Sequence, residues 1–274
     1  MNDRFVGADK AALPVNDLAV QRGYGIFDFL RVSNGIPLFI EDHLDRFYHS
    51  AREMRLPVQQ TKEELKGILS ALLQKNNLPD AGVRILLTGG NSPDGYQVTA
   101  PNLVIIQQPF VPPSSNLLQA CKLVTYQHQR QMPHIKTTDY LMAVWLQPWI
   151  KQMGADDVLY QQNGMVSECP RSNFFIVTAN HTIQTPARNI LKGVTRKQVL
   201  KVAARQGIMV EEKDISLKDI RGASEAFIAS STKRIIPVGQ VDDIVFDAVS
   251  ANPVTTRLFE LLLQNEREVI SSGV

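Results

Sequence analysis

Hydrophobic and polar positions alternate in short runs along the first part of this chain. Residues 25–32 alternate in this way and are separated from the apolar residues 36–39 by Asn34-Gly35. Because Asn-Gly accommodates the positive φ angles of a tight hairpin turn, the two runs predict an antiparallel pair of strands. Two further apolar runs, 83–88 and 103–107, have the length and composition of strands.

Two stretches between these runs follow a helical period instead. Apolar residues recur every three or four positions over 42–54 and over 61–75, which predicts two amphipathic helices. Thr61 stands at the start of the second stretch and Glu64 follows three residues later, the spacing of a capping box. Helices and strands in this arrangement predict an α+β domain over residues 1–112.

The segment Pro112-Pro113-Ser114-Ser115 extends neither a helix nor a strand, so we expect a linker at 113–118 and a second domain at 119–274. Many short strands with interspersed helices are expected in this second domain, which makes the whole chain an α/β (α+β) protein. The expected strands are 121–127, 157–161, 165–168, 173–178, 208–213, 225–230 and 235–240, and the expected helices are 138–149, 195–206, a short one capped by Ser216, and 253–269.

The composition is that of a folded soluble protein, with 44% apolar and 20% charged residues in 274. The net charge of +2, from 29 basic and 27 acidic residues, is too balanced to indicate nucleic acid or a membrane surface as a partner. Cys121 and Cys169 provide no disulfide framework. No apolar run is long enough to span a bilayer and no leader is recognised, so the expected location is the cytoplasm.

Two polar residues in the second half, Lys136 and Glu168, are candidates for a catalytic role. Lys136 follows Pro133 and stands just before an apolar run, where a partly desolvated amine acts as a nucleophile. Glu168 ends a strand-like run, and Arg171 and Asn173 follow before the chain becomes apolar again. A lone lysine is usually a solvated surface charge and a glutamate at a strand end usually lies at a rim, so the residues alone leave both alternatives open.

Six motifs in order carry a family resemblance. They are Arg-Gly-Tyr-Gly-Ile-Phe-Asp at 22–28, His-Leu-Asp-Arg-Phe at 43–47, Ile-Lys-Thr-Thr-Asp-Tyr-Leu at 135–141, Val-Ser-Glu-Cys-Pro-Arg-Ser-Asn-Phe-Phe at 166–175, Ile-Leu-Lys-Gly-Val-Thr-Arg at 190–196 and Glu-Ala-Phe-Ile-Ala-Ser-Ser-Thr at 225–232. Together they resemble the class IV (fold type IV) pyridoxal-phosphate enzymes: D-amino-acid and branched-chain aminotransferases and aminodeoxychorismate lyase. The resemblance covers nearly the whole chain and implies a larger C-terminal pseudobarrel domain and a homodimer.

The resemblance assigns a cofactor contact to each of several residues. Lys136 is the amine that binds the aldehyde of pyridoxal 5′-phosphate and later moves a proton, and Glu168 is the partner of the pyridine nitrogen. Arg46 is the phosphate arginine. The remaining assignments are the backbone amides of Val194 and Thr195 at a helix start, the hydroxyls of Ser231 and Thr232, and Tyr140 at the cofactor O3′, for which core packing is an equal alternative. No metal is expected.

Substrate recognition departs from the best-known D-amino-acid enzymes, which resemble this chain but carry an Arg-x-His pair where Asp94 and Tyr96 stand. Arg84 occupies the position of an arginine used by branched-chain enzymes, and Arg22 heads the Gly-Tyr-Gly turn; each grips a substrate carboxylate or forms an internal ion pair. Phe27 and Tyr96 complete the expected substrate contacts.

The expected function is amino-group transfer between an amino acid and a 2-oxo acid, by a D-amino-acid or a branched-chain enzyme. The alternative is 4-amino-4-deoxychorismate lyase, although the resemblance then calls for a threonine where Phe29 stands. A non-catalytic binding protein on the same scaffold is the remote alternative.

Overall fold

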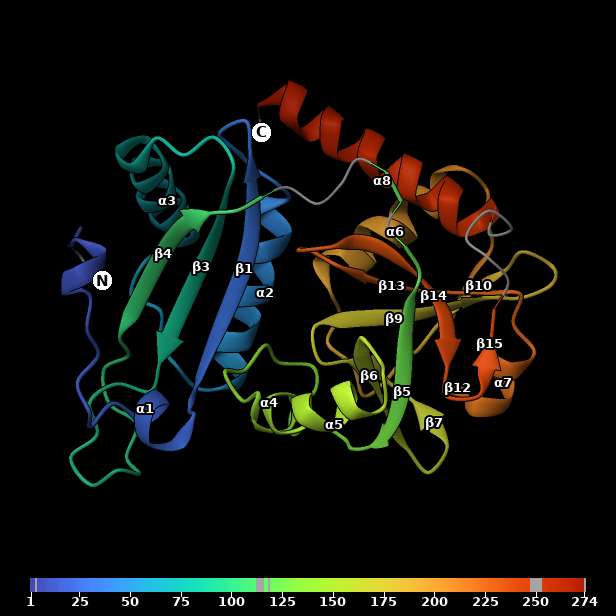
Figure 1. Ribbon diagram of the computed structural model, residues 1–274. Helices are drawn as coiled ribbons and strands as arrows, with labels where there is room; N and C mark the ends of the chain where they lie inside the picture. The colour runs from blue at the N-terminus through green and yellow to red at the C-terminus, as the bar shows by residue number, and fades with distance from the viewer. Residues whose placement is uncertain (3, 112–115, 118, 247–252, 274) are drawn as a thin grey trace. The chain divides into compact units, whose positions relative to one another are not determined.

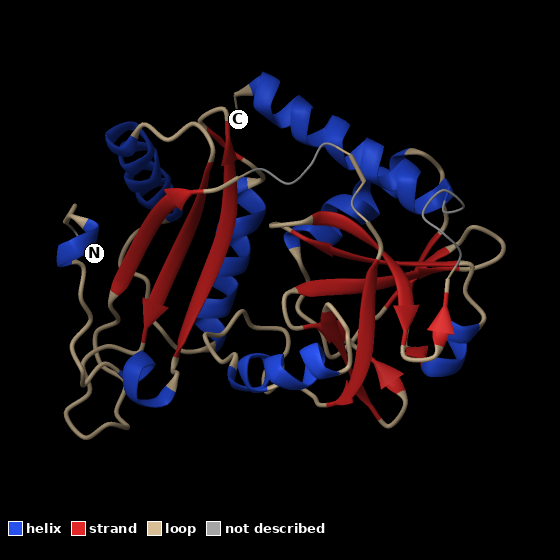
Figure 2. Cartoon of the chain, in the orientation of Figure 1, coloured by secondary structure: helices blue, strands red, loops and turns tan. Residues whose placement is uncertain are grey.

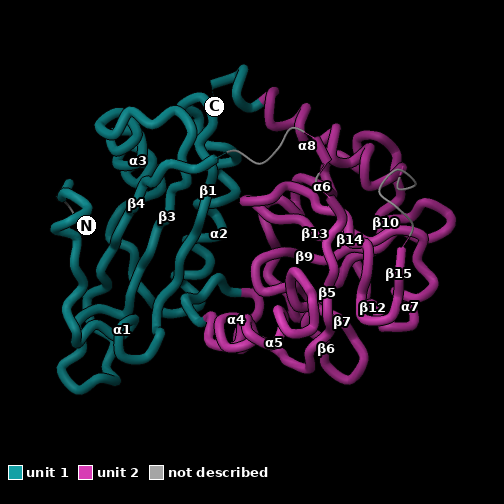
Figure 3. Tube along the Cα trace, in the orientation of Figure 1, with its two compact units in different colours: residues 1–112, 135–139, 269–274 teal, residues 113–134, 140–268 magenta. Residues whose placement is uncertain are grey.

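The chain divides into two compact units. The computed structural model describes residues 1–2, 4–111, 116–117, 119–246 and 253–273, and Figure 1 labels most of their helices and strands. Unit 1 (teal in Figure 3) contains Met1–Pro112, Ile135–Asp139 and Val269–Val274, and unit 2 (magenta) contains Pro113–His134 and Tyr140–Glu268. Two short segments expected in the second domain therefore cluster with the first. The expected linker at 113–118 lies largely outside the described residues.

Unit 1 is built on a four-stranded antiparallel sheet with the order β2-β1-β3-β4. The hairpin predicted at Asn34-Gly35 is confirmed, because both residues have positive φ angles, 50° and 79°. Val32 pairs with Pro37 across this turn. The strands are β1 (Gly25–Ser33), β2 (Ile36–Pro37), β3 (Ala81–Thr88) and β4 (Leu103–Pro109).

Two helices, α2 (Ile40–Glu53) and α3 (Lys62–Asn76), bury their apolar stripes with this sheet, as the hydrophobic period predicted. The capping box at the start of α3 is confirmed, with Thr61 and Glu64 each binding the backbone of the other. The shared core includes Leu30, Leu44, Phe47, Leu65, Leu69 and Val83. The other helical elements of the unit, η1 (Ala8–Lys10) and α1 (Leu18–Arg22), are short.

Residues 135–139 join unit 1 by pairing with the start of β1. Thr137 forms an antiparallel bridge with Ile26, and the Thr138 N–H donates to the carbonyl of Gly25 at 2.9 Å. Ile135 is fully buried in the same core as the helices of this unit. We call residues 135–139 the strap. It fixes the backbone on both sides of Lys136.

Unit 2 contains an eleven-stranded sheet among the residues that the structure describes. Figure 2 draws the strands of the chain in red. The main path of the sheet runs β11-β10-β9-β13-β14-β5-β6-β7-β12, with β15 paired to β14 and β8 to β9. The strands are β5 (Cys121–Gln127), β6 (Asp157–Gln162), β7 (Met165–Val166), β8 (Glu168–Cys169), β9 (Ser172–Val177), β10 (Ile183–Thr185), β11 (Val210–Glu212), β12 (Ile215–Ser216), β13 (Glu225–Ser230), β14 (Arg234–Val241) and β15 (Ile244–Val245).

This sheet buries apolar side chains on both faces. Phe174 belongs to a cluster formed mainly by strands, with Ile220 added, whereas its neighbour Phe175 belongs to a cluster that includes α6 (Val194–Arg205) and α8 (Pro253–Ser272). The switch follows from the alternation of side chains along a strand. Unit 2 is thus the expected sheet-rich body, and the α/β fold class of the pseudobarrel type is confirmed.

One predicted helix is wrong in its extent. The run 138–149 forms two short helices, α4 (Leu141–Trp145) and α5 (Gln147–Gln152), instead of one. The first residues of the predicted helix are not helical because the strap pairs with β1. The helix is interrupted near Pro148, which has no N–H to continue the helical hydrogen bonds. A further short helix, α7 (Leu217–Arg221), is capped by Ser216 as predicted. Within the described ranges, no helix has the length and apolarity needed to cross a membrane.

Candidate active site

The side chain of Lys136 lies against an aromatic ring in unit 1. Its Nζ is 4.6 Å from the ring centroid of Phe27, which is itself only 9% exposed. The Phe27 N–H donates to the Lys136 carbonyl at 3.0 Å, and the Lys136 N–H donates to Oγ of Ser50 at 3.4 Å. The ammonium is therefore placed on a buried apolar wall by a backbone that is hydrogen-bonded on both sides of Lys136.

Arg84 lies on the same ring. Its guanidinium carbon is 5.0 Å from the centroid of Phe27, and the side chain is exposed on β3. No acidic residue in the described part of the chain forms an ion pair with it. The internal ion pair considered for Arg84 is therefore absent there, and Lys136, Phe27 and Arg84 form one cationic group around an aromatic ring.

Arg46 is held by an acidic partner that the sequence did not predict. The buried Asp28 of β1 accepts from Nε of Arg46 through Oδ2 and from Nη2 through Oδ1, both at 2.8 Å. Oδ1 also lies 2.6 Å from Nδ1 of His43. Because an ionised carboxylate only accepts, Nδ1 carries the proton.

The charges of this group follow from burial and pairing. Burial alone raises the pKa of Asp28, but the charge of Arg46 and the hydrogen bonds from Arg46 and His43 outweigh it and hold the pKa well below its ordinary range. Burial is also the largest influence on His43, and it lowers the pKa of the imidazole despite the neighbouring carboxylate. At neutral pH the group therefore contains one carboxylate, one guanidinium and a neutral imidazole.

Glu168 is fixed in unit 2 by donors on both carboxylate oxygens. Oε1 accepts from Nε and Nη2 of Arg130 at 3.0 and 2.9 Å. Oε2 accepts from Nδ2 of Asn173 at 3.3 Å and from the Leu191 N–H at 2.9 Å. The residue is 5% exposed, so these charge-assisted bonds hold a buried carboxylate in one orientation.

Gly193 leaves the space that this arrangement needs. A Cβ at this position would lie 2.2 Å from Oδ1 of Asn173, whose Nδ2 donates to the Leu191 carbonyl at 2.7 Å. The backbone of Gly193 is extended (φ −65°, ψ 146°), so the close approach, and not the backbone conformation, requires glycine here. The residue is also the N-cap of α6 and has no capping side chain.

The start of α6 combines backbone donors with hydroxyl groups. Val194 and Thr195 are the first two residues of the helix, whose early N–H groups have no partner within the helix. Oγ1 of Thr195 lies 3.4 Å from Oγ of Ser231, whereas Thr232 lies beside Ser230, with 3.4 Å between their hydroxyls. An uncapped helix start beside the hydroxyls of Thr195 and Ser231 has the chemistry of an anion site.

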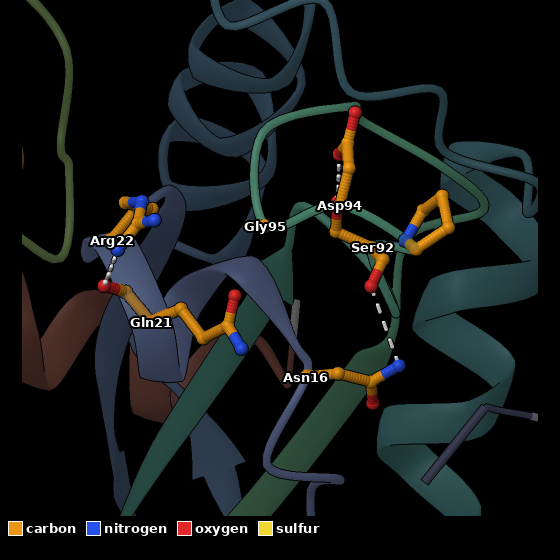
Figure 4. A pocket seen from close by; sticks show the side chains of 7 residues that line it. Asn16, Gln21, Arg22, Ser92, Asp94 and Gly95 are labelled. Atoms are coloured by element: carbon orange, nitrogen blue, oxygen red, sulfur yellow. Dashed lines mark hydrogen bonds between the residues drawn. The ribbon is translucent and has the colours of Figure 1, made fainter.

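Arg22 lines a separate surface pocket of unit 1, of about 570 Å³ (Figure 4). Opposite it, Asp94 holds the loop after β3 by accepting from Oγ of Ser92 at 3.1 Å and from the Tyr96 N–H at 2.9 Å. The side chain of Tyr96 is 86% exposed and does not line the pocket. The lining residues are Asn16, Gln21, Arg22, Ser92, Pro93, Asp94 and Gly95.

Tyr140 caps the start of α4 and is half-buried, with no capping hydrogen bond from its side chain. Sequence reasoning missed Asp28, His43 and Arg130, which hold the predicted residues in place. The His43-x-x-Arg46 spacing on one helix face was the available signal for the first group, whereas Arg130 stands in a polar stretch without a pattern. No cluster of metal-ligating side chains occurs in the described ranges.

Comparison with known proteins gives one family. Residues 25–241 match the family model described as amino-transferase class IV. A protein of Methanocaldococcus jannaschii named "Putative branched-chain-amino-acid aminotransferase" is 30% identical, over 95% of this chain and 93% of its own length. The D-alanine aminotransferase of Bacillus licheniformis is 27% identical, over 96% of this chain and 95% of its own.

Among solved structures, a "Putative 4-amino-4-deoxychorismate lyase" from Legionella pneumophila superposes with a TM-score of 0.86 at 25% identity. The match covers 94% of this chain and 97% of that one. The similar proteins thus carry three different activity names on one fold.

Proposed function

Because this chain belongs to the amino-transferase class IV family of pyridoxal-phosphate-dependent transaminases, we propose that it transfers an amino group between a D-amino acid or a branched-chain amino acid and a 2-oxo acid. The observation that carries the proposal is the strap, which holds Lys136 against Phe27 by backbone hydrogen bonds. A solvated surface lysine functions without a fixed backbone. An amine that reacts with a cofactor aldehyde and takes a proton from the substrate has to be held in position.

The donor set fits pyridoxal phosphate. The uncapped start of α6 and the hydroxyls of Thr195 and Ser231 suit a phosphate, and the buried carboxylate of Glu168 suits a protonated ring nitrogen. When bound, the cofactor would supply an aldehyde that takes up an amino group and a ring that accepts electrons from the Cα–H bond. Lys136 would bind it covalently and, once displaced, take the proton from Cα of the amino acid.

We assign the phosphate to Arg46, the Val194 and Thr195 amides, and Ser231. Thr232 is assigned an indirect part, because its hydroxyl lies beside Ser230 and not beside the helix start. Tyr140 keeps its assignment to the cofactor O3′, with core packing as the alternative.

Arg84 is the better candidate for the substrate carboxylate. It is exposed, has no acidic partner within the described ranges, and shares the Phe27 ring with Lys136. Arg22 lines a pocket together with Asp94, and Arg84 is not among the residues that line it. We therefore assign Arg22 a secondary part together with Tyr96. Phe27 supports both cations and forms the wall of the substrate site.

A homodimer in the cytoplasm is part of the proposal. Helix α4 exposes Leu141, Val144 and Trp145 by 73%, 68% and 62%, an apolar face of the kind that mediates subunit contacts. Cys121 and Cys169 are both free thiols, which fits a reducing compartment. Light scattering of the purified protein would give the mass of the assembly, and Trp145→Ser should shift it toward the monomer.

The lyase alternative is weaker. Phe29 stands where the resemblance calls for a threonine, and its ring packs edge-on against Phe110 with centroids 5.8 Å apart. It offers no hydroxyl to the reaction.

The test is a set of half-reactions followed by absorption spectroscopy. Purified enzyme is mixed separately with D-alanine, D-glutamate, L-leucine and L-glutamate, and loss of the visible cofactor band is recorded. Conversion to the aminated cofactor by the D series alone identifies a D-amino-acid enzyme, and conversion by L-leucine and L-glutamate identifies a branched-chain enzyme. No conversion by any of them, with formation of 4-aminobenzoate from aminodeoxychorismate, would contradict the proposal in favour of the lyase.

A further inference from the structure

The carboxylate of Asp28 is an unusual group for the centre of an apolar strand. Its neighbours Ile26 and Leu30, on the same face of β1, belong to the hydrophobic core, and Asp28 itself is 0% exposed. A buried carboxylate is unfavourable unless it is paired and hydrogen-bonded. Here it accepts from Arg46 twice, from His43 once and from the Phe29 N–H at 2.8 Å.

The two bonds from Arg46 occupy one edge of its guanidinium. A guanidinium has a side edge, formed by Nε and one Nη, and an end edge, formed by the two Nη atoms. Asp28 takes the side edge, because it binds Nε and Nη2. Nη1 has no hydrogen-bond partner in the described part of the chain, and the side chain retains 11% exposure.

We propose that Asp28 is a positioning residue, which fixes the guanidinium of Arg46 so that its end edge is presented to the phosphate of the cofactor. This inference rests on the proposed function, since it concerns the phosphate of pyridoxal 5′-phosphate. Asp28 does not touch the cofactor in this assignment. It acts through Arg46 alone, and His43 holds the Oδ1 atom of the same carboxylate that Nη2 of Arg46 binds.

Charge balance gives the arrangement a second property. The carboxylate and the guanidinium neutralise each other, and the imidazole of His43 is neutral at neutral pH. Arg46 therefore binds a phosphate mainly through directed hydrogen bonds and less through net charge. Removing the charge of Asp28 leaves an uncompensated arginine whose guanidinium is free to rotate toward solvent. We expect the phosphate to lose more affinity from the lost hydrogen-bond geometry than it gains from the added positive charge.

The test compares two ligands that differ only in the phosphate. Apoenzyme of the full chain is titrated with pyridoxal 5′-phosphate and with pyridoxal. The dissociation constant for pyridoxal divided by that for pyridoxal 5′-phosphate, called the phosphate ratio, measures the contribution of the phosphate. The variants are Asp28→Asn, Arg46→Ala and the double variant. Asp45→Asn is the matched control, because Asp45 is the neighbour of Arg46 on α2 but forms its ion pair at the surface with Lys62.

We expect Asp28→Asn to reduce this ratio about tenfold or more while the affinity for pyridoxal stays within twofold of wild type. In the Arg46→Ala background, Asp28→Asn should have no further effect on the ratio, because the residue acts through Arg46. General loosening of the fold would weaken both ligands equally and leave the ratio unchanged, so an unchanged ratio overturns the inference even if the variant is less stable.

The outcomes separate the inference from the function on which it rests. If Arg46→Ala lowers the ratio to about one while Asp28→Asn leaves it at the wild-type value, the positioning role is overturned and the proposed function stays intact. Equal affinity of the wild type for both ligands would overturn the phosphate site, and with it both proposals. A further loss on adding Asp28→Asn to Arg46→Ala would show that Asp28 acts directly and overturn the inference.

Discussion

Lys136 and Phe27 are joined twice, once through the backbone and once through their side chains. The Phe27 N–H donates to the Lys136 carbonyl at 3.0 Å, and the Lys136 ammonium lies 4.6 Å from the centroid of the Phe27 ring. The first contact fixes the Cα position of the lysine and the second limits the directions in which its amine can point. The amine that we propose to bind the cofactor is thus placed by the strand that also carries Asp28.

Lys136→Ala should abolish covalent cofactor attachment and turnover. The visible cofactor band is expected to disappear, and reduction with borohydride followed by peptide mapping should find no labelled lysine. In the wild type, the label should be on the peptide that contains Lys136. Lys201→Ala, an exposed lysine on α6, serves as the control and should retain the band and the activity. A label on any other lysine would contradict the assignment.

Arg84→Ala should raise the KM for the amino acid by one to two decades and leave cofactor affinity unchanged. Loss of a charged hydrogen bond costs about 1.5–3 kcal/mol, which corresponds to that range. Steady-state kinetics with the preferred amino acid provides the measurement, and Arg52→Ala is the control because Arg52 is 75% exposed on α2. An unchanged KM would return Arg84 to a structural role on the Phe27 ring.

Gly193→Ala should destabilise the protein and weaken cofactor binding together. The added methyl displaces Asn173, which then loses its bonds to the Leu191 carbonyl and to Glu168, at a cost of about 1–3 kcal/mol. Thermal unfolding and cofactor titration are the two measurements. Gly222→Ala is the matched control, since its Cβ would approach no atom closer than 3.8 Å. Equal behaviour of the two variants would disprove the role of the close approach.

The stability of the protein should fall as the pH drops below about 6.5, and His43 should account for part of this slope. Burial lowers the pKa of His43 in the folded state, whereas the unfolded side chain has a pKa of about 6.5. Below that pH the unfolded chain binds a proton that the folded chain excludes, so the stabilisation present above it is lost. One proton changes the slope by at most about 1.4 kcal/mol per pH unit.

His43→Gln should therefore flatten the decline in unfolding free energy between pH 7 and 5, measured by denaturant titration at several pH values. His49→Gln on the same helix is the control. The pKa of Asp28 is also lowered, so its contribution has the same sign but is lost in more acidic solution, below the ordinary range of a carboxyl group. Parallel slopes for wild type and His43→Gln would rule out His43 as the titrating group.

Local signals in the sequence predicted much of the fold. The hairpin at Asn34-Gly35 and the capping box of Thr61 and Glu64 were predictable because each depends on residues close together in the chain. The extent of the helix after the strap was not, because pairing of Thr137 with Ile26 outweighs the helical period. That pairing joins residues more than a hundred positions apart.

The candidate site divides in the same way. Motifs led to the assignments proposed for Lys136 and Glu168, because each residue lies within a short run of the sequence that resembles the family. The groups that orient the site were missed, since Asp28 is 18 residues from Arg46 and Arg130 is 38 residues from Glu168. Ion pairs at such separations leave no periodic mark on a sequence. Only the folded chain brings them together.

The strap also limits how this protein can be divided or recombined. Residues 135–139 complete unit 1, although the chain on both sides of them belongs to unit 2. A fragment that ends near residue 112 would lack the buried Ile135 and the backbone partners of β1, and a chimera joined there would take its lysine from one parent and its Phe27 wall from the other. A single crossover between the units therefore separates two halves that must fit each other, and an exchange of modules between relatives would have to carry the strap along with the N-terminal sheet.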